Sequence, residues 1–168
     1  MNKYFENNKH LYFTIRKMLL SKDSIKNFII KYYIPFVNQK FNEYFRKYSF
    51  PFQVVWDNNF DAKLYGSNYE DLDISNLSTG QRKAIDLSLV FTFSELQSKI
   101  FDATIGLSFY DEICTGLQLD KFDTTLDILK DESKNKCIFI TEQYLTDFTR
   151  FDKVYEVIND NGSKLKIL

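Results

Sequence analysis

The amino-acid sequence predicts an α/β protein in which a mostly parallel sheet is flanked by helices. Two short apolar segments, residues 104–110 and 137–141, have the length and composition of buried strands. A long apolar-rich segment without Gly or Pro, 82–101, and an amphipathic segment, 121–134, have the residue spacing of helices. Because these strands and helices alternate along the chain, the strands are expected to pair in parallel.

The N-terminal part of the chain predicts two helices. Residues 3–20 form the first, and the polar segment 21–24 separates it from a second that begins at Ile25. Pro35 is expected to kink or divide the second helix, because proline lacks the backbone N–H of the helix ladder. The first helix has Leu11, Ile15 and Leu19 among its apolar positions. In the second, apolar residues recur three and four positions apart, at Ile25, Phe28, Ile29, Tyr32 and Phe36, and Phe41, Tyr44, Phe45 and Tyr48 continue the pattern. These aromatic residues are expected to form core rather than a stacking platform for bases.

Two β-hairpins are also expected. Segments 51–56 and 60–65 are rich in aromatic and β-branched residues, and Asp57-Asn58-Asn59 between them is a turn sequence. At the end of the chain, residues 153–168 form a terminal hairpin across the turn sequence Asn161-Gly162.

Composition limits the classes of function. The net charge of -1 gives no global attraction to nucleic acid, so any contact with DNA must come from a local patch or a partner. We expect DNA to be bound only indirectly. Cys114 and Cys137 lack CxxC spacing, which indicates a reduced, intracellular protein. No segment approaches the roughly 18 apolar residues of a membrane-spanning helix. We therefore expect a cytoplasmic protein with no membrane partner. Frequent Lys, Asn, Phe, Tyr and Ile favour an AT-rich genome such as that of a phage, in which case the location is the host cytoplasm.

The junction Leu77-Ser78-Thr79-Gly80-Gln81 predicts an anion site. It follows an acidic exposed loop, 67–76, and begins the long helical segment. The first backbone N–H groups of a helix are unpaired and carry partial positive charge, and a glycine there lets a phosphate approach the backbone closely. The Ser78 hydroxyl either caps the helix or binds a phosphate oxygen. A plain Ser-capped helix is the alternative interpretation.

Two adjacent carboxylates, Asp111 and Glu112, end the first predicted strand. Burying charge is costly, so acids at the carboxyl end of a strand are typical of a site. Ligands of open α/β sheets bind at that edge. A solvated strand end with two surface acids is the alternative. The second predicted strand ends at Thr141, and Glu142 follows it.

These three segments, in this order, resemble the C-terminal lobe of an ABC-type ATPase head, with a signature motif, a Walker B strand and a switch-loop strand. The variety is similar to the SMC-like repair ATPases, such as the large subunits of the SbcCD exonuclease and of tailed-phage recombination endonucleases. The stretch Ile25–Asn38 resembles the segment where the coiled-coil arm re-enters the head, which favours repair ATPases over transporters. The resemblance implies a helical lead, 1–24, which could be a coiled-coil stump, and an ATPase lobe, 25–168.

The resemblance also implies a role for each site residue. In this family two heads hold ATP between them, so Ser78, Gly80 and Gln81 would contact a nucleotide held mainly by the other head. Asp111 would orient Mg²⁺ through water, and Glu112 would be the general base that activates the attacking water. ATP and Mg²⁺ are therefore expected as cofactors only in an assembled head.

Three departures from the family pattern limit this activity. The sequence contains no Gly-x-x-x-x-Gly-Lys-Ser/Thr, so the main cradle for phosphates, the Walker A loop, would have to come from another lobe. Glu142 stands where the family has a switch histidine, and an ionised carboxylate cannot donate a hydrogen bond to a phosphate. Gln118 stands where the loop after the carboxylates normally ends in Asp. We therefore expect no ATP hydrolysis by the chain alone, and hydrolysis by a completed head stays open.

Two hypotheses of function follow. In the first, the chain is half of an SMC-like ATPase head that pairs with a Walker A lobe and, with a metallonuclease subunit, processes DNA double-strand breaks for repair and recombination. No acidic or histidine cluster resembles a nuclease metal site, so any nuclease activity would belong to the partner. In the second, the chain is a catalytically degenerate mimic that docks on a full ATPase as a regulator or inhibitor. An unrelated α/β domain with chance matches is a third interpretation.

Overall fold

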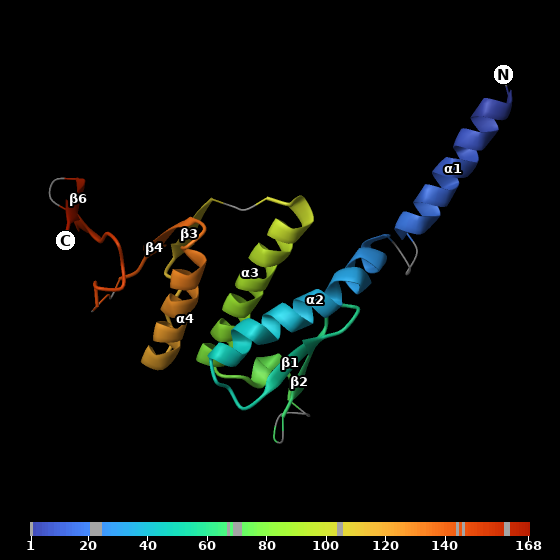
Figure 1. The fold of residues 1–168 in the computed structure, drawn as a ribbon. Helices are drawn as coiled ribbons and strands as arrows, with labels where there is room; N and C mark the ends of the chain where they lie inside the picture. Colours follow the sequence, from blue (N-terminus) through green and yellow to red (C-terminus); the bar gives the residue numbers. More distant parts are fainter. Residues whose placement is uncertain are drawn as a thin grey trace.

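The computed structural model describes residues 2–20, 25–66, 68, 72–103, 106–143, 145, 147–159 and 162–168, with side chains described for all of these except 2–8, 18 and 25–28. This part of the chain contains four α-helices and three two-stranded sheets (Figure 1). Of the helices described, none has both the length and the apolar character needed to cross a membrane.

The first two helices are α1, Asn2–Leu20, and α2, Ile25–Lys47. Helix α1 projects away from the rest of the molecule (Figure 1), and the side chains of Leu11, Ile15 and Leu19 on it are exposed. Pro35 lies inside α2, which continues through it as one helix, so division at the proline does not occur. The buried side chains of Ile34 and Val37 on either side explain why, because they pack this part of the helix against the core.

The core forms where α2 packs against α3, Thr79–Phe101, and against a hairpin of β1, Gln53–Trp56, and β2, Ala62–Tyr65. The two strands pair antiparallel, which confirms the predicted hairpin. The aromatic side chains of α2 beyond the proline, Phe41, Phe45 and Tyr48, are fully buried, as predicted. Tyr32, nearer the start of the helix, is 70% exposed, so the aromatic core does not extend that far.

The α/β region contains one parallel pair of strands, β3, Leu107–Asp111, and β4, Cys137–Thr141. Helix α4, Leu119–Glu132, connects them. Phe109 pairs with Phe139, and Asp111 pairs with Thr141. Parallel pairing is therefore confirmed, although the parallel sheet in the described residues is this single pair. Residues 104 and 105 of the first predicted strand lie outside the description.

The two strands of this pair are covered on one face only. On the covered face, the Tyr110 ring lies against Phe91 of α3, with ring centroids 6.5 Å apart. On the other face, Leu107, Phe109 and Phe139 are exposed. The predicted burial of these strands is therefore found on one face only, because no element in the described part of the chain packs over this second, open face.

The last two strands, β5, Tyr155–Asn159, and β6, Ser163–Ile167, form the predicted terminal hairpin. Asn161 of its expected turn lies outside the described residues, as do 67 and 69–71 of the expected acidic loop. The end of that loop forms a short 3₁₀ helix, η1, Ile74–Asn76.

Candidate functional site

Helix α3 begins with a reciprocal cap between Ser78 and Gln81. Ser78 Oγ accepts a hydrogen bond from the Gln81 N–H at 3.3 Å, and Gln81 Oε1 accepts one from the Ser78 N–H at 2.9 Å. This arrangement is a capping box, so the predicted cap is confirmed. The cap uses Ser78 Oγ as an acceptor, while a hydroxyl also has a hydrogen to donate. A structural cap and a phosphate contact are therefore compatible at this serine.

At Gly80, the start of α3 lies next to the loop that follows β3. A Cβ atom built on Gly80 would lie 3.7 Å from the carbonyl oxygen of Gly116, an ordinary van der Waals distance. Gly116 has a φ of +85°, a conformation that favours glycine. Two segments of the predicted site, the start of α3 and residues 112–118, are thus neighbours in space.

The carboxyl ends of β3 and β4 bring Asp111 and Glu112 beside Thr141. The Thr141 hydroxyl donates a hydrogen bond to Asp111 Oδ1. The Glu112 backbone N–H donates to the Thr141 carbonyl at 2.9 Å, which continues the pairing of the strands by one bond. Glu112 itself has a φ of +46°, which is strained for a residue with a side chain. The backbone therefore turns sharply at the predicted general base.

Asp111 lies on the open face of the β3–β4 pair. Along β3, alternate side chains point to opposite faces, so Leu107, Phe109 and Asp111 share one face. On β4, the partners Phe139 and Thr141 lie on the same face. The predicted metal-binding carboxylate thus adjoins an exposed apolar surface.

Glu142 binds the loop after β3. Its Oε1 accepts a hydrogen bond from the Cys114 backbone N–H at 2.6 Å. Burial raises the pKa of the Cys114 thiol to about 12, and the nearby Glu142 carboxylate adds to this increase, while Lys83 opposes it. The side chain that replaces the expected switch histidine is therefore engaged with its own chain.

Gln143 is a site residue that sequence reasoning missed. Its Nε2 donates a hydrogen bond to Glu112 Oε1. A carboxylate only accepts hydrogen bonds, so the amide nitrogen is the atom that faces it. Because parallel strands end at the same edge, the position of Gln143 just after β4 could have indicated this contact.

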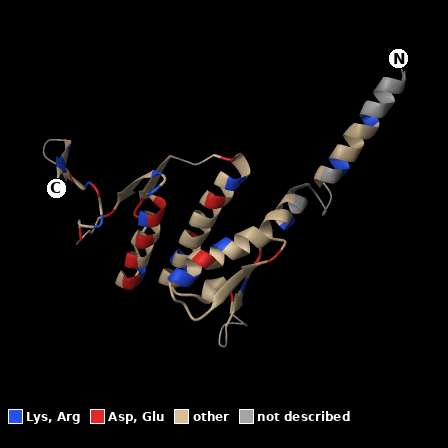
Figure 2. Cartoon of the chain, in the orientation of Figure 1, with Lys and Arg blue, Asp and Glu red and all other residues tan. Residues whose placement is uncertain are grey.

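Gln118 lies at the N-cap of α4 and makes no side-chain cap hydrogen bond. Gln118, which stands where the family has Asp, therefore leaves the N-terminus of α4 without a side-chain cap. Helix α4 itself is acidic (Figure 2), and Arg150 pairs with two of its carboxylates, Asp123 and Asp127.

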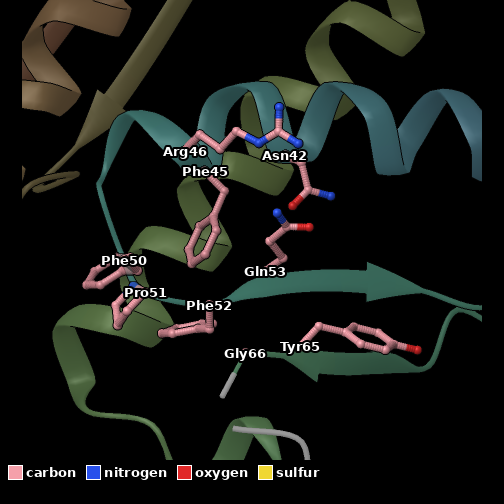
Figure 3. Close-up of a pocket in the computed structure, with 9 residues that line it drawn as sticks. All are labelled: Asn42, Phe45, Arg46, Phe50, Pro51, Phe52, Gln53, Tyr65 and Gly66. Carbon is pink, nitrogen blue, oxygen red and sulfur yellow. The ribbon is translucent and has the colours of Figure 1, made fainter. Parts of the chain in front are cut away.

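A separate hollow of about 420 Å³ lies between α2 and the β1–β2 hairpin (Figure 3). The rings of Phe45, Phe50 and Phe52 lie on one side, and the amide side chains of Asn42 and Gln53 lie together on the other, above the Tyr65 ring. Its described lining residues are Asn42, Phe45, Arg46, Phe50, Pro51, Phe52, Gln53, Tyr65 and Gly66. They include none of the predicted site residues, so the hollow is distinct from the β3–β4 edge.

Comparison with solved structures shows the class of fold, which is that of SMC ATPase heads. A structure from work on ATP-driven dimerization and DNA-stimulated activation of SMC ATPases matches with a TM-score of 0.70 and 18% identity, over 84% of this chain and 89% of that chain. The Smc head of Pyrococcus furiosus, with an extended coiled coil and bound to the C-terminal domain of ScpA, matches with a TM-score of 0.63 and 19% identity, over 80% of this chain and 35% of that one.

Among curated proteins, the chain is similar to exonuclease subunit 2 of two phages. It is 29% identical to the Enterobacteria phage T4 protein over 98 residues, which is 58% of this chain. It is 26% identical to the Escherichia phage RB69 protein over 95 residues, which is 56% of this chain. The chain spans only 18% and 17% of the length of these relatives. No protein-family model matches the sequence. The predicted resemblance to an SMC-like head and to a phage exonuclease subunit is thus confirmed.

Proposed function

We propose that this chain is the signature-bearing half of an SMC-like ATPase head, which acts when a lobe with a phosphate-binding loop covers the open face of β3–β4. The supporting observation is that Asp111 shares this face with the exposed rings of Phe109 and Phe139. Parallel strands in α/β proteins are normally covered on both faces. A lobe that buries the two rings would bring its bound phosphates to Asp111.

The residues at this edge suit Mg²⁺ and ATP. Mg²⁺ is usually held by one or two carboxylates, substrate phosphates and water, and an exposed Asp111 carboxylate oriented by Thr141 fits that pattern. Within the described residues, no group of three or more His, Cys, Asp or Glu could hold a metal ion without such help. When bound, the ion would supply positive charge beside the phosphates.

The chain's own residues would then perform three tasks. Glu112 accepts a proton from the attacking water as the general base. The first turn of α3, with Ser78, Gly80 and Gln81, presents backbone N–H groups and a hydroxyl to a phosphate across the interface between two heads. Asp111 would orient Mg²⁺ through water.

We further propose that the assembled head works with a nuclease subunit in DNA-end processing and recombination, because the phage relatives are exonuclease subunits. The acidic face of α4 (Figure 2) repels nucleic-acid phosphates, which favours DNA contact through the partner. Residues 1–24 would be the stump of a coiled coil, since Leu11, Ile15 and Leu19 form an exposed apolar stripe at helical spacing.

A second candidate function is a degenerate lobe that docks on a complete ATPase as a regulator or inhibitor. The observation that favours it is Glu142, whose carboxylate is bound to the Cys114 N–H and offers no donor to a phosphate. In that case the chain would hydrolyse no ATP, and Glu112 would not act as a general base.

The substitution Glu112→Gln tests the proposal in the chain purified together with its Walker A lobe. Loss of a general base typically slows turnover about 10²–10⁴-fold, and ATP should remain bound. The control is Asp86→Asn, which removes an exposed carboxylate on α3 and should leave turnover unchanged. Unchanged turnover in the Glu112→Gln variant would contradict the general-base role and favour the docking function.

A further inference from the structure

We propose that Glu142 and Gln143, the two residues after β4, are positioning residues for Glu112. Gln143 orients the Glu112 carboxylate directly, and Glu142 holds the loop that begins at Glu112. The inference rests on the proposed role of Glu112 as the general base.

The strained backbone of the loop after β3 requires stabilising contacts from outside the loop. It starts at Glu112 with a positive φ and folds into successive turns, with bonds from the Thr115 N–H to the Glu112 carbonyl at 3.2 Å and from the Leu117 N–H to the Cys114 carbonyl at 3.1 Å. A non-glycine residue in this conformation persists only where its surroundings determine it.

Glu142, which follows the neighbouring strand β4, makes such a contact with the loop. Its carboxylate bonds the Cys114 N–H at 2.6 Å, in the middle of the loop, where Ile113 and Cys114 are buried. A hydrogen bond to an ionised acceptor is stronger than a neutral one. The contact thus ties the end of β4 to the loop that carries the general base.

Gln143 acts on the side chain of Glu112. Its amide is a neutral donor, so it can fix the direction of the carboxylate without titrating and without repelling a nearby phosphate. The two residues thus have different partners: Glu142 binds the loop at Cys114, and Gln143 binds the side chain of Glu112. Replacing Glu142 by His should therefore impair the head, because it removes the hold on the loop.

The Glu142 contact is tested in the full chain alone, by the rate at which a thiol reagent labels Cys114 after Cys137→Ser has removed the other cysteine. Labelling of the buried Cys114 requires the loop to open. We expect Glu142→Ala to speed labelling about tenfold. Glu142→Gln, which keeps an acceptor oxygen, should restore most of the protection. The control is Glu132→Ala, a mostly buried carboxylate that lies on α4 and forms an ion pair with Lys136. Equal labelling rates in the parent and Glu142→Ala, or equal acceleration by both alanine variants, would overturn the role of Glu142.

The Gln143 contact is tested by ATP turnover of the chain joined by its Walker A lobe. We expect Gln143→Leu to lower kcat at least about tenfold while KM for ATP stays within about twofold, and Gln143→His, which also offers an N–H, to recover part of kcat. Full kcat in Gln143→Leu, with turnover lost in Glu112→Gln, would overturn this inference and leave the proposed function standing. Full kcat in Glu112→Gln would overturn both.

Discussion

The rings of Phe109 and Phe139 stack on the open face of the β3–β4 pair, with centroids 5.0 Å apart and ring planes at 15°. Asp111 and Thr141 are the next residues on the same face. Fully burying a phenylalanine stabilises a protein by about 1.5–3 kcal/mol. Because Phe109 and Phe139 are exposed, the chain alone gains only part of this stabilisation. Exposed apolar surface of this kind is typical of an interaction site.

The substitution Phe109→Lys should therefore leave the isolated chain stable and abolish its association with a Walker A lobe. Phe109 is 71% exposed, so we expect its replacement to change the free energy of unfolding by less than about 0.5 kcal/mol. Thermal denaturation and co-purification with the lobe measure the two effects. Tyr65→Lys, on the separate β1–β2 hairpin, is the control and should keep the association. A loss of several kcal/mol of stability in Phe109→Lys would show that the ring belongs to the core.

The substitution Gly80→Ala separates the fold from the phosphate contact. A methyl group at Gly80 meets only the Gly116 carbonyl at an ordinary contact distance, and alanine is better than glycine in a helix by about 0.5–1 kcal/mol. Chemical denaturation should show unchanged or higher stability, while the complete head loses ATP turnover because phosphate can no longer approach the backbone. Gly106→Ala, which adds a methyl group in open space, should preserve turnover. Full turnover in Gly80→Ala would argue for a simple helix cap.

Glu112 and Asp102 both adopt a left-handed backbone, with φ values of +46° and +47°. Because this conformation costs a residue with a side chain about 1–2 kcal/mol, glycine at either position should raise the free energy of unfolding by about 1 kcal/mol. Only Glu112→Gly should abolish ATP turnover of the assembled head. Equal turnover in both glycine variants would contradict the general-base role of the Glu112 carboxylate.

The substitution Gln118→Asp should stabilise the chain. Gln118 has the extended backbone of an N-cap residue and provides no side-chain cap to α4. An aspartate there could accept a bond from the first turn, which typically contributes about 0.5–2 kcal/mol. Urea denaturation measures the gain, with Gln118→Asn as a neutral capping variant. If neither variant changes the free energy of unfolding, the side chain at position 118 cannot reach the free N–H groups at the start of α4.

Stability should decline at alkaline pH through Tyr48. Burial raises the pKa of its hydroxyl from 10.0 to about 12, and Thr125 Oγ1 lies 3.0 Å from it. The neutral form is favoured in the folded state, so this contribution is complete below pH 10 and is lost as the pH rises from 10 towards 12. A shift of this size corresponds to roughly 3 kcal/mol.

Tyr48→Phe should make the unfolding free energy less dependent on pH in that range, at a cost of about 1 kcal/mol at neutral pH for the lost hydrogen bond. Burial also raises the pKa of Tyr44, so some dependence should remain. Tyr32→Phe, at an exposed position, is the control for removal of a tyrosine hydroxyl. A Tyr48→Phe variant with the parent's slope would contradict this assignment.

Local patterns predicted most of the elements and the residues at the strand ends. Periodicity placed α3 and α4, and the apolar run ending in Asp111-Glu112 placed β3, because spacing and charge are properties of neighbouring residues. What they could not predict depends on contacts distant in sequence. Phe109 is exposed because no element among the residues that the structure describes covers it, and apolar residues in the sequence do not reveal this.

The partners of Glu142 and Gln143 show the same limit. Sequence comparison with the family pattern marked Glu142 as a lost switch residue, whereas the structure shows its carboxylate on the Cys114 N–H, 28 positions away. The position of Gln143 after a predicted strand placed it near the site edge, but its partner could not be identified, because that depends on the register that sets β4 beside β3. The continuity of α2 through Pro35 likewise depends on packing.

The most direct test of the central claim is to isolate the chain from its native source with an affinity tag, beside the Phe109→Lys variant, and to identify the associated proteins by mass spectrometry. The account predicts a partner that carries a Walker A loop without a signature segment of its own, present with the parent chain and absent with Phe109→Lys. A complete ATPase, with both its own loop and its own signature segment, retained equally by both chains, would contradict the account and identify the chain as a docking mimic.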